Sequence, residues 1–262
     1  MSKEQKIVYY ENEASDEVAG ISKNTIKIDG SFKFIHKNPI WRMLCFVVYR
    51  LIMKPFAFLF CKLRLSLKIV NKHILKPYRE SGYFLFGNHT LMAGDAFIPN
   101  VVDYFKKTYV IVHPDNISTK GTKNFIMMCG AIPTPTEFSA FRPFLNTIKQ
   151  RCDEGACICI YPEAHVWPYC TFIRNFPDIS FSYPIKSRAP VFCSTVTYQK
   201  KKFGRSPKVT VYLDGPFLYD ENLPTKEAQR ALRDAVYSTM CSRAKNSTYE
   251  IIKYVKRTEN ND

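Results

Sequence analysis

The stretch YFLFGNHTLMAGDAF, Tyr83–Phe97, decides the fold that we expect for this chain. Its first four residues are large and apolar, which is typical of a strand buried inside a sheet, and Gly87 ends that strand in a turn. Polar side chains follow the turn: Asn88, His89 and Asp95. In open α/β sheets the reacting groups gather at the carboxyl ends of the strands. The stretch therefore predicts a strand that delivers a histidine and a carboxylate to a functional edge.

A second stretch, ACICIYPE, Ala156–Glu163, has the same organisation. An apolar strand is followed almost directly by the carboxylate of Glu163. The carboxyl ends of parallel strands meet at the same edge of a sheet. We therefore expect His89, Asp95 and Glu163 to face one cleft.

Apolar strands alternate with helix-length segments from Tyr83 onward, which predicts an α/β fold with a mostly parallel central sheet flanked by helices. The expected strands are Tyr83–Phe86, Thr108–Val112, Ala156–Tyr161, Pro190–Tyr198 and Lys208–Leu213. The expected helices are Asp95–Lys106, Thr119–Cys129, Phe138–Glu154 and a long final helix from Lys226 to about Lys256, with Thr225 as its cap. Residues 1–24 read as a polar lead, residues 25–75 as a strand or hairpin (Thr25–Ile35) followed by a membrane-associated helical segment, and residues 76–262 as the α/β domain.

The segment IWRMLCFVVYRLIMKPFAFLF, Ile40–Phe60, is as long as a membrane span, but cations interrupt it and Pro55 is expected to break it. Arg42, Arg50 and Lys54 fall on one side of a helical wheel, and the opposite side is apolar. That pattern predicts an amphipathic docking segment that lies in the lipid interface with its cations toward anionic head groups. The alternative is a two-helix lid packed on the protein's own core, and the two can be combined.

The composition favours an anionic partner. The 262 residues include 38 Lys and Arg against 23 Asp and Glu, a formal net charge of +15. Such a surface suits nucleic acid, an acidic membrane or a phosphorylated substrate. The nine cysteines lack the spacing of zinc ligands, so we expect reduced thiols and no metal site. Residues 1–24 are polar and do not read as a secretory signal.

The pair His89 and Asp95 suits general-base chemistry. The imidazole can take a proton from an attacking hydroxyl, while the carboxylate fixes the tautomer and stabilises the imidazolium. Asn88 can hold a backbone or substrate oxygen. The sequence has no G-x-S-x-G motif, so it offers no Ser nucleophile of that kind. The hydroxyl to be activated is therefore expected to belong to the substrate.

Four blocks of sequence resemble those of the lysophospholipid (1-acylglycerol-3-phosphate) acyltransferases, the PlsC-like family. The family's first block, N-H-x-x-x-x-D, is similar to Asn88–Asp95, and its third, F-P-E-G-T-R, is similar to Tyr161-Pro162-Glu163. The second block, a Gly-containing turn, is similar to Cys129–Pro133, and the fourth, an apolar strand opened by Pro, to Ala189-Pro190-Val191. The family also has an N-terminal membrane-docking helix pair, which Ile40–Leu67 resembles.

The resemblance implies an O-acyltransferase of phospholipid biosynthesis. It would move a fatty acyl group from acyl-CoA or acyl-carrier protein, as co-substrate, to the hydroxyl of a (lyso)glycerolipid, without a cofactor or a metal. His89 would be the base and Asp95 its partner, and Asn88, Gly130 and Glu163 would contact substrate. The implied partners are a lysophospholipid acceptor and an anionic membrane surface, with no nucleic acid. The implied location is the cytoplasmic face of the cell membrane, as a peripheral or monotopic protein.

The sequence departs from the family pattern at three places. The second block lacks its terminal Arg, and Pro135 stands near that place. Five residues separate His89 from Asp95, where the family has four, so we expect a loop or a bulged first turn, which Gly94 permits. The family's phosphate-binding Arg is missing after Glu163, where the chain has Ala-His-Val. Its possible replacements are Arg142, Arg174 and Lys186.

His165 either contacts the acceptor or is a loop histidine bonded to nearby backbone, and the sequence leaves both open. Other functions are also compatible with these residues. The same base could activate water, which would make the chain an acyl-thioester or lipid hydrolase. The positive charge and the aromatic residues would also suit a nucleic-acid-binding protein, although no signature of such a fold is present. The altered blocks would suit a lipid-binding protein that has lost activity.

Overall fold

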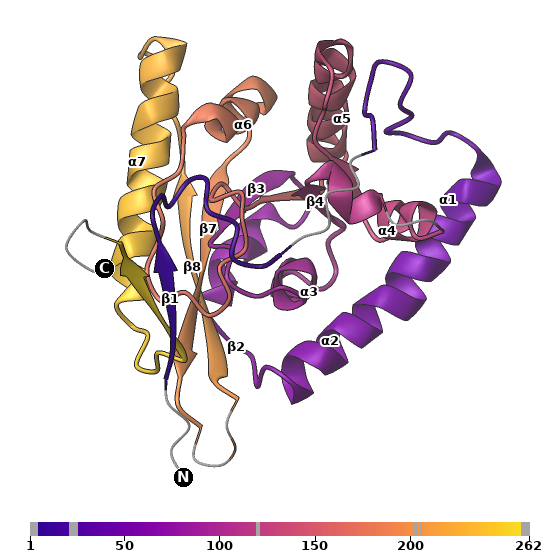
Figure 1. Cartoon of the computed structure of the whole chain (residues 1–262). Helices are drawn as coiled ribbons and strands as arrows, with labels where there is room; N and C mark the ends of the chain where they lie inside the picture. Colours follow the sequence, from indigo (N-terminus) through magenta and orange to yellow (C-terminus); the bar gives the residue numbers. More distant parts are fainter. Residues whose placement is uncertain (1–4, 21–25, 119–120, 202–203, 205, 258–262) are drawn as a thin grey trace.

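The computed structural model describes residues 5–20, 26–118, 121–201, 204 and 206–257, and shows a sheet between two layers of helices (Figure 1). Among these residues, seven strands form the central sheet in the order β2-β8-β7-β3-β6-β4-β5. Their bounds are β2 Lys68–Val70, β3 Tyr83–Gly87, β4 Thr108–Val112, β5 Ala131–Pro133, β6 Cys157–Ile160, β7 Val191–Gln199 and β8 Lys208–Phe217. The α/β class and the five expected strands are confirmed; the short strands β2 and β5 were not expected.

The centre of the sheet is parallel. Strand β3 pairs in parallel with both β6 and β7, and β4 pairs in parallel with β6 and β5. Strand β8 runs antiparallel to β7, and β2 follows β8 in parallel. The carboxyl ends of β3, β6, β4, β5 and β7 therefore share one edge of the sheet. Residues Tyr83–Phe86 of β3 are fully buried because this strand lies in the middle.

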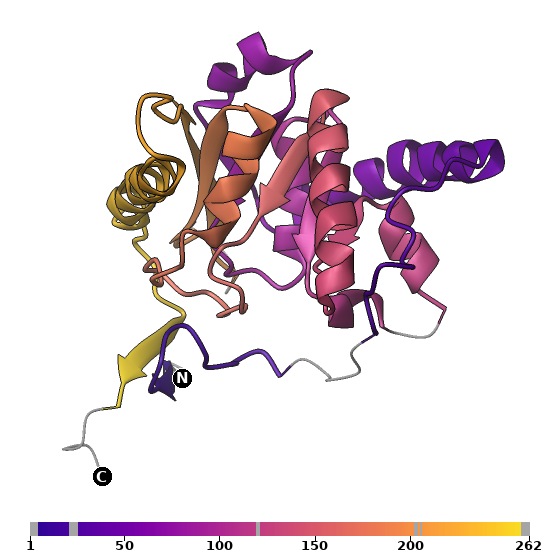
Figure 2. The same cartoon turned by 90° about the horizontal axis from the view of Figure 1, so that it is seen from above.

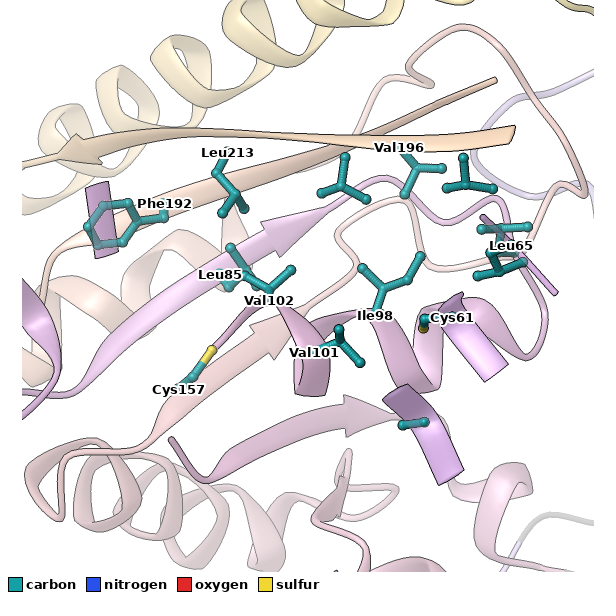
Figure 3. Packing of buried hydrophobic residues seen from close by; sticks show 14 of the residues in the cluster. Cys61, Leu65, Leu85, Ile98, Val101, Val102, Cys157, Phe192, Val196 and Leu213 are labelled. Carbon is teal, nitrogen blue, oxygen red and sulfur yellow. The ribbon is translucent and has the colours of Figure 1, made fainter. Parts of the chain in front are cut away.

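One face of the sheet is covered by α3 (Gly94–Val102) and by a long N-terminal helix. Figure 3 shows the packing on this face, where Ile98 and Val101 of α3 lie between the sheet and Cys61 of the long helix. Side chains at alternate positions of the strands supply the other half of this core, among them Leu85 and Phe192. These side chains form one continuous hydrophobic cluster, so the inner side of the long helix is part of the core of the domain.

The opposite face is covered by three helices, α5 (Phe141–Asp153), α6 (Ser182–Ser187) and α7 (Thr225–Ala244). Phe84 and Phe86 of β3 point to this side and pack against side chains of these helices, such as Phe144 and Val236. The remaining helix, α4 (Lys123–Met128), lies near the β5 edge beside the start of the long helix (Figure 1). Short 3-10 turns occur at Lys72–Tyr78, Pro114–Ile117, Phe138–Ala140 and Ile179–Phe181.

The long helix runs from Pro39 to Leu63, 25 residues, as α1 (Pro39–Phe46), a π-helical segment (Val47–Met53) and α2 (Lys54–Leu63). The expected break at Pro55 does not occur. The backbone N–H of Lys54 bonds to the carbonyl oxygen of Tyr49, five residues back, and this wider turn removes the clash that a proline causes in a regular α-helix. Figure 2 shows the helix projecting beyond the body of the domain.

The helix Pro39–Leu63 is long and apolar enough to cross a membrane, and only 28% of its most apolar window is buried. Large apolar side chains are exposed along its outer side: Ile40, Met43, Leu44, Phe46, Val47, Leu51, Ile52, Phe56, Phe58, Leu59 and Leu63. The cations do not all point outward as expected. Lys54 is buried and donates to the carbonyl oxygens of Asp103, Tyr104 and Lys106, and Arg50 donates to that of Phe105 at 2.7 Å.

Two expectations for the ends of the chain were wrong. Residues 26–35 contain no strand, because the backbone of Ile28 bonds to Thr136 in a loop instead. Thr25, the first residue of the expected strand, lies outside the described residues. Thr119 and the residue after it, which begin the helix expected from Thr119 to Cys129, lie outside them as well. The final helix ends at Ala244 rather than near Lys256. The chain then returns as β9 (Ile252–Lys256), which pairs in parallel with β1 (Lys6–Tyr10) inside the expected polar lead.

Candidate active site

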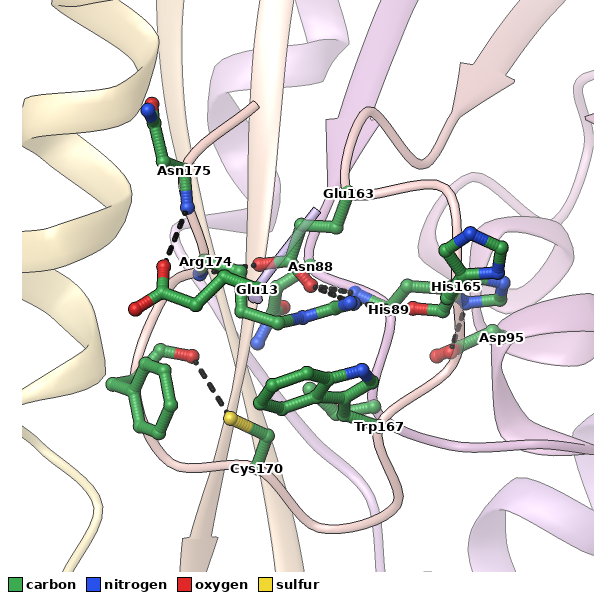
Figure 4. A network of polar contacts seen from close by, with 12 residues as sticks. Glu13, Asn88, His89, Asp95, Glu163, His165, Trp167, Cys170, Arg174 and Asn175 are labelled. Carbon is green, nitrogen blue, oxygen red and sulfur yellow. Dashed lines mark hydrogen bonds and ion pairs between the residues drawn. The ribbon is translucent and has the colours of Figure 1, made fainter. Parts of the chain in front are cut away.

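The candidate site lies at the shared carboxyl edge of β3 and β6. His89 follows β3 by two residues, and Asp95 is the second residue of α3. Glu163 lies in the loop after β6, beside the backbone of His89. The structure thus brings the three residues together (Figure 4). They do not all face one cleft as expected: the side chain of Glu163 has no exposed surface and that of Asp95 is 3% exposed, so His89 is the accessible member of the three.

His89 and Asp95 form a direct pair. The distance from Nδ1 of His89 to Oδ2 of Asp95 is 2.7 Å, and the same carboxylate oxygen accepts the backbone N–H of Leu91 at 2.9 Å. An ionised carboxylate can only accept, so with Asp95 ionised the imidazole proton is assigned to Nδ1 and Nε2 is left as a proton acceptor. The side chain of His89 is 19% exposed, whereas that of Asp95 is 3% exposed. In this pair, Asp95 is buried and fixes the orientation of the imidazole, while His89 is accessible to act as a base.

Burial acts on the carboxylate of this pair. It raises the pKa of Asp95 above its ordinary value, because the charged form loses water. The hydrogen bonds from His89 and from the backbone N–H groups oppose this change. An imidazolium formed at His89 during a reaction would add a positive charge next to Asp95, which favours the ionised carboxylate. Asp95 is thus placed to stabilise a protonated His89 through its negative charge.

Tyr161 holds the ring of His89 from one side. The two rings are stacked, with centroids 4.6 Å apart and planes 16° apart, and the Tyr161 hydroxyl donates to the backbone oxygen of Asp95 at 2.6 Å. Gly87 makes this possible, since a Cβ there would lie 2.7 Å from the Tyr161 ring. In the sequence, Tyr161 stood out only as part of the block Tyr161-Pro162-Glu163, and no sequence pattern predicted its contact with His89.

The residue added between His89 and Asp95 is absorbed in the loop before α3. The backbone N–H of Asp95 bonds to the carbonyl oxygen of Leu91, which closes one turn before the helix. Gly94 is needed there for space, because a Cβ would lie 2.8 Å from the Leu91 side chain; its backbone does not take the left-handed conformation. The expected loop is confirmed. Gly94 was expected for its freedom of backbone conformation, but the structure requires it because a larger side chain would collide with Leu91.

Asn88 is buried and bonds to the backbone of β7. Its side-chain oxygen accepts the N–H of Val196 at 2.7 Å, and its amide donates to the oxygen of Val196 at 3.1 Å. Asn88 therefore continues the sheet ladder past the end of β3. In this structure it fixes the backbone next to His89 and does not point at an accessible surface.

Glu163 is equally buried and forms an ion pair with Arg174. Its Oε2 accepts the guanidinium of Arg174 at 2.7 Å and the backbone N–H of His89 at 3.1 Å, and its Oε1 accepts the N–H of Arg174 at 3.1 Å. Both side chains have no exposed surface. Burial raises the pKa of Glu163, and the charge of Arg174 opposes this. Glu163 thus holds the backbone of His89, and it is Arg174 that neutralises it.

Of three other residues singled out in the sequence, His165 lies in the same loop as Glu163, within the site network (Figure 4), whereas Gly130 and Arg142 lie elsewhere. His165 is half-buried in the loop after β6, and its carbonyl oxygen accepts a hydrogen bond from Arg174. Gly130 precedes β5, at the opposite end of the sheet from His89, with φ of 100° and with room for only a hydrogen beside the carbonyl oxygen of Thr108. Arg142 is exposed in the first turn of α5.

The structure separates the three candidates for a phosphate-binding cation. Arg174 is fully buried against Glu163 and against the ring of Trp167, 4.8 Å from its guanidinium, so it is not available to an acceptor. Arg142 and Lys186 remain exposed. In the described part of the chain, no group of three or more His, Cys, Asp and Glu side chains is placed to hold a metal ion.

No protein-family model matches the sequence, and no curated protein matches it. A solved structure does match: 1-acyl-sn-glycerophosphate (LPA) acyltransferase, PlsC, from Thermotoga maritima, with a TM-score of 0.51 and 13% identity, over 81% of this chain and 86% of that chain. The chain shares the fold of an acyltransferase. At this identity the likeness concerns the fold alone.

Proposed function

We propose that the chain is a membrane-associated O-acyltransferase that moves a fatty acyl group from acyl-CoA or acyl-carrier protein to the hydroxyl of a (lyso)glycerolipid. The observation that carries the proposal is the pair of His89 and Asp95, joined at 2.7 Å at the carboxyl edge of a PlsC-like sheet. The imidazole is partly exposed while its partner is buried, which is the arrangement that a general base requires.

In the proposed reaction the acceptor hydroxyl gives its proton to Nε2 of His89 as its oxygen attacks the thioester carbonyl. The carbon–sulfur bond breaks when the tetrahedral intermediate collapses. The leaving thiolate then takes the proton back from the imidazolium, so the products are an ester and a free thiol. Asp95 stabilises the imidazolium between these two steps. Tyr161, Asn88 and Glu163 act as positioning residues, since they hold the ring and backbone of His89.

The outer side of the helix Pro39–Leu63 supports a membrane location. Its exposed apolar side chains would enter the lipid interface while the inner side stays packed on the domain. A soluble domain rarely exposes so large an apolar stripe without a partner. Such a placement would bring the protein to a membrane that contains its acceptor lipid.

The test is a product analysis with mixed acyl donors and a panel of lysolipids. His89→Ala should lower ester formation by about 10²–10⁴-fold, the range for loss of a general base. Its circular dichroism and urea midpoint should stay close to those of the unaltered chain. Normal turnover by this variant would refute the mechanism. Free fatty acid formed at the same rate with and without acceptor would instead identify a hydrolase, and no turnover with any donor would favour a lipid-binding protein.

A further inference from the structure

A cavity of about 300 Å³ lies between the start of the long helix, α4, α5 and the outer strands β4 and β5. Its walls include Trp41, Tyr49, Tyr109 and Met128. His89 does not line it, and the cavity is placed toward the other end of the sheet. Lys107, at its inner wall, precedes β4 and is level with the start of β3, roughly 20 Å of extended chain before the site. The cavity is thus separate from the candidate active site.

The Lys and Arg side chains in the otherwise mostly aromatic and apolar lining give the cavity its charge. Four of the lining side chains are Lys or Arg: Arg42, Arg50, Lys107 and Arg151. Among the described residues that line the cavity, none is an Asp or a Glu. They come from three separate parts of the chain, namely α1 with the π-helical segment, the residue before β4, and the end of α5. A cluster of like charges drawn from separate elements costs stability unless an anion joins it.

Two tyrosine rings gather three of these cations. Nζ of Lys107 lies 3.2 Å from the ring centroid of Tyr49 and 5.2 Å from that of Tyr109. The guanidinium of Arg151 lies 5.0 Å from Tyr109, and that of Arg50 lies 5.8 Å from Tyr49. Aromatic faces attract cations but do not neutralise them. The rings therefore hold the three cations in place without neutralising their charges.

Partners within the protein relieve little of this charge. Arg50 donates to the carbonyl oxygen of Phe105, and Lys107 has a long bond of 3.5 Å to that of Met128. Among the described residues, Arg151 is the one cation of the four with a carboxylate partner, that of Glu154 at 2.7 Å. Burial lowers the pKa of Lys107 to about 7, which shows how poorly the site solvates that ammonium. An anion in the cavity would supply the missing partner.

We propose that this cavity is a binding site for a phosphate group, distinct from the candidate active site and independent of its chemistry. Guanidinium groups match the tetrahedral oxygens of a phosphate in two-pronged hydrogen bonds, and a lysine adds a point charge. Arg151 is already paired with Glu154, so Arg42, Arg50 and Lys107 are the cations that a phosphate monoester would join, and its charge would favour the protonated form of Lys107.

The position of the cavity indicates a lipid headgroup as the source of this phosphate. The cavity lies on the inner side of the helix whose outer side exposes Met43, Leu44 and Val47. If that outer side rests in the lipid interface, the inner side is at the level of the headgroups. A lipid phosphate could then enter the cavity while the acyl chains stay in the membrane. Free phosphate has the same chemistry and is the alternative source.

The test compares binding of the full chain to three ligands. These are phosphatidylcholine vesicles with phosphatidic acid, vesicles with a fatty acid at matched surface charge, and inorganic phosphate at matched ionic strength. The variants are Lys107→Met and Arg42→Gln, with Lys62→Gln as the control. Lys62 is exposed on α2 and does not line the cavity. Its replacement removes one positive charge from the long helix, as Arg42→Gln does.

Both cavity variants should weaken binding to phosphatidic acid by roughly tenfold or more, the equivalent of one lost charge-assisted hydrogen bond, and Lys62→Gln should change it far less. Arg42 is exposed, so Arg42→Gln decides the matter if Lys107→Met does not fold. Binding of inorganic phosphate with the same variant pattern would identify free phosphate as a ligand, and its absence would identify the headgroup. Equal losses in all three variants, or equal binding to fatty acid and phosphatidic acid, would overturn the proposal.

Discussion

Replacing Arg174 by methionine should destabilise the protein strongly, because it leaves a buried carboxylate without its counter-charge. Arg174 and Glu163 have no exposed side-chain surface, and their closest atoms are 2.7 Å apart. Breaking such a pair from one side costs about 3–5 kcal/mol, most of it from the uncompensated charge. For a chain of this size that loss corresponds to a decrease in melting temperature of roughly 10 °C.

The loss should depend on pH in a defined direction. Burial already raises the pKa of Glu163, and removal of Arg174 takes away the charge that opposes this. A carboxyl group whose pKa is higher in the folded state binds more protons there than in the unfolded state, so its contribution to stability improves as the pH falls. The difference in unfolding free energy between the variant and the unaltered chain should therefore shrink between about pH 8 and pH 5, at up to about 1.4 kcal/mol per pH unit.

Urea unfolding followed by tryptophan fluorescence measures this directly. Trp167 is fully buried, and the guanidinium of Arg174 lies over its ring, so the indole reports on the same site. Arg230→Met is the matched control. Arg230 is 66% exposed and 3.9 Å from Asp178, and loss of a surface pair of this kind costs about 0–1 kcal/mol. A loss of less than about 1 kcal/mol for Arg174→Met, or one that does not change with pH, would refute the assignment of a buried ion pair.

Three further changes test the remaining contacts. Asp95→Asn should lower kcat by about 10²–10⁴-fold with little change in KM, since the amide cannot stabilise an imidazolium at His89; a shift in KM alone in steady-state kinetics would contradict this. Gly87→Ala should reduce both activity and stability, the latter by about 1–3 kcal/mol in urea unfolding, because its Cβ would displace the Tyr161 ring; an unchanged urea midpoint would exclude that contact. Leu51→Glu should abolish most co-sedimentation with vesicles and leave the melting temperature unchanged, because this side chain is 62% exposed; equal binding by the variant would argue against the helix as the docking element.

The long helix shows where a local pattern was sufficient and where it failed. Its apolar side and its place in the chain could be predicted, because periodicity and composition are local properties. The continuation of the helix through Pro55 could not be predicted, since it depends on a π-helical segment that accommodates the proline. The direction of Arg50 and Lys54 could not either, because the carbonyl oxygens that bind them belong to the loop 103–106.

The sequence by itself determined five strands of the central sheet, the edge at which His89 and Asp95 emerge, and the small number of residues between them. All three follow from the alternation of apolar segments and from residues close in the chain. Only the tertiary structure decided that Glu163 faces Arg174, that Tyr161 stacks on His89, and that β9 returns to pair with β1. The same holds for the cations around the cavity, which come from distant parts of the chain. A sequence records which side chains exist, whereas their solvation and charge partners depend on which distant elements pack together.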